Sequence, residues 1–272
     1  MSADCCFSTL LSAAQRGWLA CDGDEALLSL ALPIEGIDPL LALPQLAEHE
    51  SLQVLWDSAP GLCLAAAGPC QELELAGSRR FEQAQRFADL CLSRLHDTAA
   101  DSPAHARPRV LLRFRFFDQV SERRRSEAVV PSVQAVLPRW QLSRQGRRGW
   151  LRLNGVVSSA ADCRELAEQL WLKHEQLLKT PATPTPLKPQ ALVAATEPET
   201  WRQRYAAALT RGIDLVNSGD LHKLVLAVRH RIVLADTFDP LPLLKRLRRQ
   251  QAGSCRFLWQ RHAGDAFFGA SP

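Results

Sequence analysis

The stretch Leu-His-Lys-Leu-Val-Leu-Ala-Val at residues 221–228 decides the fold of this 272-residue chain. Its middle, Leu224–Val228, is apolar at every position, so an extended chain would be apolar on both faces. Such a run is typical of a strand in a sheet that is covered on both sides. We therefore predict a long buried strand over Leu221–Leu234, with Lys223 near its beginning.

The segments on either side of this strand predict two helices and a further pair of strands. The first helix begins at the capping-box-like Thr200-x-x-Gln203 and ends at Gly219. The second begins at Asp239-Pro240, a good pair for the N-cap and first helical position, and ends at Gly253. The two strands that follow are Cys255–Trp259 and Ala266–Phe268.

The N-terminal part of the sequence predicts the same mixture of elements. Arg109–Phe117 is rich in β-forming residues and predicts a strand. Pro138–Ser143 and Trp150–Asn154 predict a hairpin with a longer loop at residues 144–149. The predicted helices are Phe81–Leu95 and one that begins at Ser159. Helices and strands in this order indicate a mixed α+β layer structure.

A proline-rich segment divides the chain. The run Thr-Pro-Ala-Thr-Pro-Thr-Pro-Leu-Lys-Pro occupies residues 180–189, and its four prolines forbid a helix and favour an extended connector. We therefore expect an N-terminal region at residues 1–179, a linker at 180–190 and a second domain that begins at 191 and continues to 272.

Composition excludes several classes of protein. With 46% hydrophobic and 23% charged residues the chain is typical of a globular protein, and no apolar run approaches the roughly 20 residues of a membrane span. The N-terminus lacks the features of a signal peptide, so we expect a soluble cytoplasmic protein without membrane contact. The net charge of +4 is not concentrated in one stripe, which argues against nucleic-acid binding. None of the eight cysteines has metal-site spacing, and we expect them to be reduced.

Lys223 is the candidate catalytic residue. A lysine at the mouth of a doubly buried strand would be partly desolvated, which disfavours its charged form and lowers its pKa. A neutral amine can act as a general base. The alternative is that Lys223 ends the strand and extends into water without a chemical role, as lysines often do. The neighbouring His222 would point to the opposite face of a strand, and we interpret it as structural.

Several segments, taken in order, resemble the chorismate-utilising enzymes, the anthranilate synthase component I-like family. That family has a K-V-V-L-A-R-like strand, an F-x-P-led helix and a hairpin that ends in G-[AS]-S-P-E-R-L. The counterparts in this chain are Lys223–Val228, Phe238–Leu241 and Phe267–Pro272, and further similarity lies at Trp56, Arg80–Glu82, Phe114–Asp118 and Leu137–Trp140. The chain departs from the pattern at Val228, where arginine is common, and at Leu112-Arg113, where glycines are usual.

The resemblance implies an α+β fold with largely antiparallel sheets and packed helices. It also implies an isochorismate synthase, because the members that add water to chorismate have lysine at the position of Lys223, whereas those that use ammonia have glutamine. Lys223 would remove a proton from the water that attacks C2, and a glutamate would protonate the departing C4 hydroxyl. The resemblance places that glutamate and the Mg²⁺ ligands beyond Pro272, so we expect this chain to be an inactive fragment.

Two alternatives remain open. A salicylate synthase shares the lysine but also eliminates pyruvate. The Leu137–Trp140 region is more similar to the isochorismate synthases of menaquinone and phylloquinone synthesis, which favours those enzymes. A non-catalytic binding module is the alternative outside the enzymes.

Overall fold

The computed structural model of the chain describes residues 3–22, 24–58, 60–116, 131–179, 192–195, 198–227, 232–236, 238–262 and 265–271. These residues form two compact units. The first consists of Met1–Thr185 together with Pro240–Pro272, and the second is Pro186–Asp239. Each unit is described by itself.

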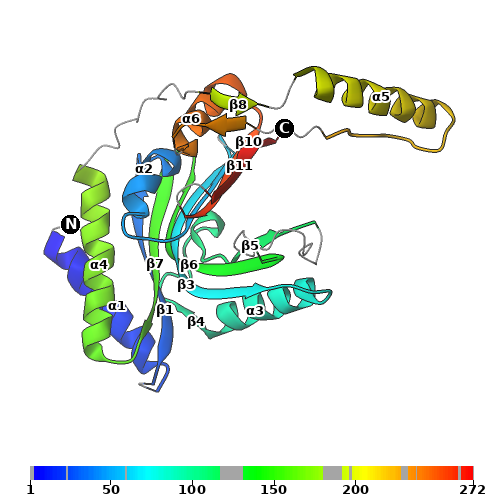
Figure 1. The fold of residues 1–272 in the computed structure, drawn as a ribbon. Helices are drawn as coiled ribbons and strands as arrows, with labels where there is room; N and C mark the ends of the chain where they lie inside the picture. Colours follow the sequence, from blue (N-terminus) through cyan, green and yellow to red (C-terminus); the bar gives the residue numbers. More distant parts are fainter. Residues whose placement is uncertain are drawn as a thin grey trace. The chain divides into compact units, whose positions relative to one another are not determined.

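The first unit is built on a nine-stranded sheet (Figure 1). Its strand order is β11-β10-β2-β3-β6-β7-β1-β4, and β5 also pairs with β6. All neighbours are antiparallel except β1 and β4, which run parallel. The strands are β1 (Ala26–Glu35), β2 (Gln53–Asp57), β3 (Leu62–Leu75), β4 (Leu95–Asp97), β5 (Leu111–Phe114), β6 (Val133–Gln145), β7 (Arg148–Val157), β10 (Cys255–His262) and β11 (Asp265–Ser271). The predicted α+β class with a largely antiparallel sheet is confirmed.

Helices cover one side of this sheet and enclose the main core. They are α1 (Ala3–Leu19), α2 (Pro39–Leu46), α4 (Ala160–Lys179) and α6 (Pro240–Gln250). The strands contribute alternate residues, such as Leu28 and Leu30 of β1 and Leu151 and Leu153 of β7, all fully buried. Full burial of one leucine side chain is worth about 1.5–3 kcal/mol. This unit also contains α3 (Arg80–Arg94), which packs on β3 and β6 around a smaller cluster, and the short 3₁₀ helix η1 (Ala104–Ala106).

Most of the elements predicted from caps and turns are present. The helix that begins after Ser159 is α4, where Ser159 Oγ accepts the Asp162 N–H at 3.1 Å. The β6–β7 hairpin is confirmed, but its loop is only Gly146-Arg147 and not the longer loop expected. Gly146 has φ +62°, which suits a two-residue turn, and this tight turn lets the flanking residues pair in the strands. The strand predicted at Arg109–Phe117 is shorter, at Leu111–Phe114.

The C-terminal segment belongs to the sheet of the N-terminal part. The strand β10 pairs with β2 through Arg256–Gln260, and β11 pairs with β10. The compact units therefore do not follow the expected boundary at residue 191, because a helix and two strands after residue 239 join the first unit. The expected linker at residues 180–190 lies outside the described residues.

The second unit contains β8 (Leu192–Ala195), α5 (Pro198–Asn217) and β9 (Ile232–Leu234). The strands β8 and β9 pair antiparallel. The predicted buried strand over Leu221–Leu234 is wrong for Leu221–Ala227, which is not a strand and is mostly exposed, and residues 228–231 lie outside the described part. A doubly buried strand needs pairing partners and a layer on each face. Within the described residues of this unit, one helix and two short strands are too few to supply them.

Candidate functional site

Lys223 follows the end of α5 in the second unit. The helix is closed by Gly219, which has φ +82°, and the Leu221 N–H donates to the Leu215 carbonyl at 3.0 Å. The chain then turns back, and Leu224 lies against Gly212 of α5. A Cβ atom at residue 212 would lie 2.5 Å from Leu224 Cδ2, so the glycine makes this contact possible. The contact fixes the backbone next to Lys223.

The side chain of Lys223 is exposed. Among the described residues it makes no ion pair within 4.0 Å. The prediction that the Lys223 amine is partly desolvated is therefore wrong for the described structure. That prediction required a buried strand at this position, and residues 221–227 do not form one. His222 is exposed as well. What the structure provides is an accessible amine on a segment held against α5.

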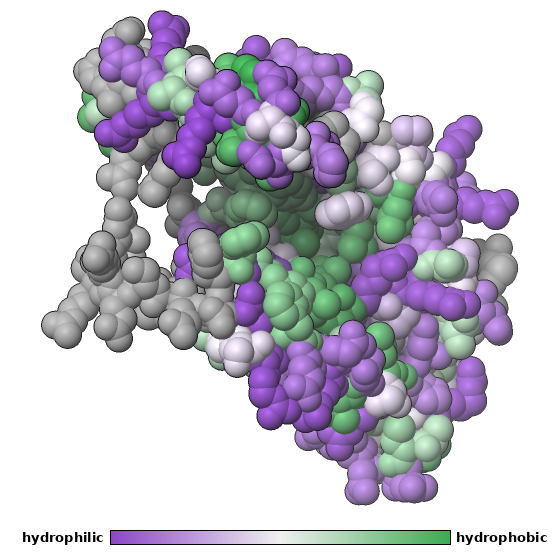
Figure 2. Space-filling model, turned by 90° about the vertical axis from the view of Figure 1, so that its right-hand side faces the viewer, coloured by the Kyte–Doolittle hydropathy of each residue, from purple (hydrophilic) through white to green (hydrophobic). Residues whose placement is uncertain are grey.

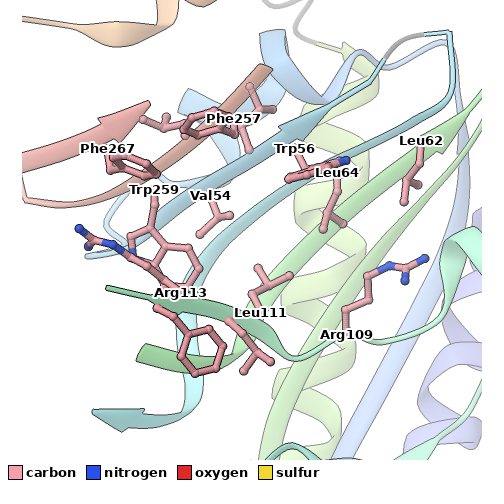
Figure 3. Close-up of a pocket in the computed structure, with 14 residues that line it drawn as sticks. Val54, Trp56, Leu62, Leu64, Arg109, Leu111, Arg113, Phe257, Trp259 and Phe267 are labelled. Atoms are coloured by element: carbon pink, nitrogen blue, oxygen red, sulfur yellow. The ribbon is translucent and has the colours of Figure 1, made fainter. Parts of the chain in front are cut away.

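A large apolar pocket lies in the first unit, on the side of β2 and β10 that faces away from the helices. Its volume is about 540 Å³. Strand alternation explains the position, because Leu55 and Leu258 point into the main core while Val54, Trp56 and Trp259 point to the other side. Figure 2 shows a hollowed, largely apolar surface bordered by hydrophilic side chains, and Figure 3 shows the residues that line the pocket.

Two arginines supply the positive charge at this pocket. Arg113 Nη1 donates to Gln134 Oε1 at 3.1 Å, and its guanidinium carbon lies 5.8 Å from the centroid of the Phe267 ring. Burial lowers the pKa of Arg113 from its ordinary value. Arg109 donates to the Ala104 carbonyl at 3.0 Å, and its Nε is buried without a hydrogen-bond partner among the described residues. The described residues that line the pocket include no nucleophile and no general acid or base, so the pocket is suited to binding and not to proton transfer.

A cluster of charged residues, the Asp57 cluster, ties the C-terminal segment to the N-terminal strands. It consists of Asp38, Asp57, Cys63, Arg248 and Arg256. Arg248 Nε donates to Asp57 Oδ2 at 2.6 Å, and Arg256 Nε donates to the same oxygen at 3.2 Å. Burial alone would raise the pKa of Asp57, but hydrogen bonds from Arg256 and Arg248 lower it to about 2. The cluster thereby holds α6 and β10 against β2.

The Asp57 cluster also includes a basic residue near the end of α6. The basic residues near the end of this helix, Arg248 among them, would form a solvated face if α6 were a simple amphipathic surface helix. Arg248 instead turns inward and also binds Asp38, with Nη1 2.5 Å from Oδ2. Burial raises the pKa of the neighbouring Cys63 thiol to about 11, and Asp57 reinforces this shift. Cys63 is therefore a protonated hydrogen-bond donor to Asp57, at 3.1 Å, and not a nucleophile.

The described residues offer no site for the expected Mg²⁺. They contain no group of three or more His, Cys, Asp or Glu side chains that could hold a metal ion. The residues present thus do not fit the metal. In the described part of the chain, none of the helices has both the length and the apolar character needed to span a membrane.

Comparison with known proteins decides the family. The sequence model of the family described as "Chorismate binding enzyme" matches residues 12–272. This chain belongs to that family. The match includes Lys223, the helix at Pro240 and the strand β11, so the resemblance seen in the separate motifs extends over nearly the whole chain. No protein with a curated description matches the chain.

The fold is also similar to that of a solved isochorismate synthase. The structure described as MenF, the menaquinone-specific isochorismate synthase from Escherichia coli, matches with a TM-score of 0.60 and 19% sequence identity. The match covers 96% of this chain and 55% of the MenF chain. This chain therefore spans about half the length of the solved protein, and the similarity at this identity establishes the fold alone.

The structure divides the motifs of the family between the two units. Lys223 lies in the second unit, whereas the counterparts of the F-x-P and G-A-S-P motifs lie largely in α6 and β11 of the first. Neither the apolar pocket nor the Asp57 cluster was predicted from the sequence. Phe257 and Trp259 alternate with Leu258, and this pattern indicates a strand with apolar side chains on both faces of the sheet. No sequence signal pairs Asp57 with an arginine 199 residues away.

Proposed function

We propose that the protein to which this chain belongs is an isochorismate synthase, an Mg²⁺-dependent isomerase that converts chorismate to isochorismate. The observation that carries the proposal is the family match over residues 12–272, with lysine at position 223 of the K-V-V-L-A-R-like segment. The fold similarity to an isochorismate synthase supports it. The reaction would serve menaquinone or phylloquinone synthesis in the cytoplasm.

Lys223 is the proposed general base. Water adds at C2 of chorismate as its proton passes to Lys223 Nζ, the ring double bonds shift, and the C4 hydroxyl departs as water after protonation by an acid. Chorismate and isochorismate are isomers, so the water gained at C2 balances the water lost at C4. General-base catalysis by a positioned side chain typically contributes about 10²–10⁴-fold in rate. Leu224, the neighbour of Lys223, packs against Gly212 of α5, which limits the movement of the backbone beside the proposed base.

The acid and the metal ligands are not assigned to described residues. The family pattern places the acid in an E-A-L-A-G-T-like segment, which this chain does not contain. A pocket that can hold chorismate also needs positive charge, because the substrate is a dianion.

The test uses a full-length protein that contains this chain, incubated with chorismate and Mg²⁺. Separation of the products should give isochorismate, and salicylate with pyruvate as direct products would refute the proposal in favour of a salicylate synthase. Lys223→Ala should lower turnover on the order of 10²-fold or more with a smaller effect on KM. Lys179→Ala, which removes an exposed lysine that pairs with Glu175 on α4, is the matched control. Near-wild-type turnover of Lys223→Ala would exclude this residue as the base.

A further inference from the structure

Two cysteines outside the pocket and the Asp57 cluster lie on neighbouring elements, Cys70 on β3 and Cys91 on α3. Both are free thiols. Cys91 is 6% exposed and lies on the inner face of α3, whereas Cys70 is only partly buried. A small reagent dissolved in water can therefore reach one of the two.

The packing of α3 on β3 places both cysteines at the same level of this contact. The turn between the two elements reverses the chain, so α3 runs antiparallel to the end of β3 beside it (Figure 1). Ala84 of α3 and Leu73 of β3 belong to one apolar cluster. From Ala84, Cys91 lies about 10 Å further along the helix and returns to the same helix face. From Leu73, Cys70 lies about 10 Å back along the strand, which is the same direction.

The two thiols also interact electrostatically across this contact. Burial raises the pKa of the Cys70 thiol to about 11, the charge of Arg139 lowers it, and Cys91 raises it further. Burial raises the pKa of the Cys91 thiol as well. Because the thiolate is the reactive form, both groups are protonated and react slowly at neutral pH. The pair is therefore reduced at rest, as expected for the cysteines of this chain.

The backbone at Cys70 is less constrained than that of a regular strand. The pairing of β3 with β6 shifts register between Pro69 and Gln71, so Cys70 has no paired residue on β6. Such a bulge interrupts the hydrogen-bond ladder locally. The helix opposite is held by few buried side chains, which are Arg80, Ala84 and Cys91. Small shifts of either element can bring the two sulfur atoms together while the rest of the sheet keeps its pairing.

We propose that Cys70 and Cys91 are a site of reversible disulfide formation, which links β3 to α3 when the surrounding thiol–disulfide balance becomes oxidising. The oxidant is a small-molecule disulfide such as oxidised glutathione. The thiolate of the partly exposed Cys70 attacks one sulfur of this disulfide, and one glutathione leaves as a thiolate. The thiolate of Cys91 then attacks Cys70 Sγ of the mixed disulfide and releases the second glutathione. The two protons lost by the protein thiols are taken up by the two released glutathione molecules.

The bridge would restrain the connection between β3 and α3. It closes a loop of chain in the unfolded state, which stabilises the folded state. For a loop of this size the thermal midpoint of the oxidised chain should rise by roughly 5–10 °C, and a reductant should reverse the rise. The inference does not depend on the reaction that the protein catalyses.

The test equilibrates the 272-residue chain with glutathione redox buffers at about pH 8.5, near the ordinary pKa of a thiol. Acid stops the exchange, the free thiols are alkylated, and a chymotryptic digest is analysed by mass spectrometry without reduction. Cleavage after Leu64 separates Cys63 from Cys70. A peptide that joins Cys70 to Cys91 is expected. Its effective thiol concentration should be at least about tenfold higher in the folded chain than in urea, because a bridge that stabilises the fold is favoured by the fold.

Serine variants assign the cross-link to the two residues. Cys70→Ser and Cys91→Ser should each abolish the joined peptide and the rise in thermal midpoint. Cys21→Ser is the matched control, because Cys21 is also partly buried and follows α1, which packs on α4 and β1. This control should form the same cross-link as the unaltered chain.

Two results would overturn the inference. One is an effective concentration in the folded chain that is no higher than in urea. The other is a cross-link of Cys70 to a different cysteine of the folded chain. The comparison of folded and unfolded chain needs no substitution, so it decides the inference even where a serine variant fails to fold.

Discussion

Replacement of Asp57 by asparagine isolates the contribution of the buried charge cluster. Asp57 and Arg256 are both fully buried, and Arg248 contacts the same carboxylate. Asparagine keeps the size of the side chain but removes its negative charge, so Arg256 loses its ionic partner in the interior. Breaking a buried ion pair from one side costs about 3–5 kcal/mol. Arg248 retains Asp38 and should add little to this cost.

The lowered pKa of Asp57 gives a second value for the stabilisation that its ion pairs provide. The difference between the ordinary pKa of 3.8 and the folded pKa of about 2 corresponds to about 2 kcal/mol of stabilisation, at about 1.36 kcal/mol for each pH unit. Because the folded pKa is the lower one, this contribution is complete above pH about 4. It is lost as the pH falls through the folded value of about 2. Asp57→Asn should therefore abolish this part of the acid sensitivity between pH about 4 and about 2.

The assay is urea unfolding of the 272-residue chain followed by circular dichroism at pH 7 and at pH 3. We expect Asp57→Asn to lower the free energy of unfolding by about 3–5 kcal/mol at pH 7, a large part of the 5–15 kcal/mol typical of a domain. Glu82→Gln, which breaks an exposed pair with Arg79, should leave the midpoint unchanged. Adding Arg256→Met to Asp57→Asn should recover stability, since the buried arginine charge is then removed. A loss below about 1 kcal/mol for Asp57→Asn would show that the cluster does not hold α6 and β10 in place.

The remaining predictions concern the second unit, the connector and the chain as a whole. Gly212→Val should lower turnover of a full-length protein, because a side chain there meets Leu224 and displaces the backbone next to Lys223. Steady-state kinetics measures the turnover, and circular dichroism should show unchanged helicity. Unchanged turnover would refute the prediction. Replacement of residues 180–189 by a Gly/Ser segment of equal length should leave activity nearly unchanged, and a collapse of activity without unfolding would contradict the linker prediction. The 272-residue chain alone should convert no chorismate, because its sequence lacks the E-A-L-A-G-T-like segment in which the family pattern places the acid. Isochorismate detected in a product assay of the purified chain would contradict that assignment of the acid.

Helices that begin or end at a capping residue were predicted correctly from the sequence. The helix α4 was found from Ser159 and Asp162: Ser159 Oγ accepts the Asp162 N–H, and Asp162 Oδ2 accepts the N–H of Ser158, one residue before the N-cap. The helices α5 and α6 were found from Gly219 and from Asp239-Pro240. These patterns involve residues within one turn of each other, so the sequence shows them directly. The boundaries are correct to within a few residues for the same reason.

Long-range pairing limits what local patterns can predict. A buried strand at Leu221–Leu234 was predicted from hydrophobicity alone. Hydrophobicity indicates that a segment is more stable when buried, but it does not show which strands or helices would bury it. The strand β10 was predicted, but nothing local indicated that it pairs with β2, about 200 residues earlier. The pocket arises from that pairing, because Trp259 and Val54 become neighbours only in the assembled sheet. A binding surface built across distant strands is therefore invisible to local patterns.

The wrong strand prediction and the missed apolar pocket have one physical cause. The segment Leu221–Ala227 and the apolar pocket are both rich in apolar residues, and both expose large apolar side chains, such as Val225 at 78% and Trp56 at 50%. Each has the composition of an interior without the elements that would enclose it. Lys223 lies within the first of these, so the same covering that removes apolar surface from water would also desolvate its amine. Whether Lys223 is desolvated is therefore decided by long-range packing and not by the local sequence.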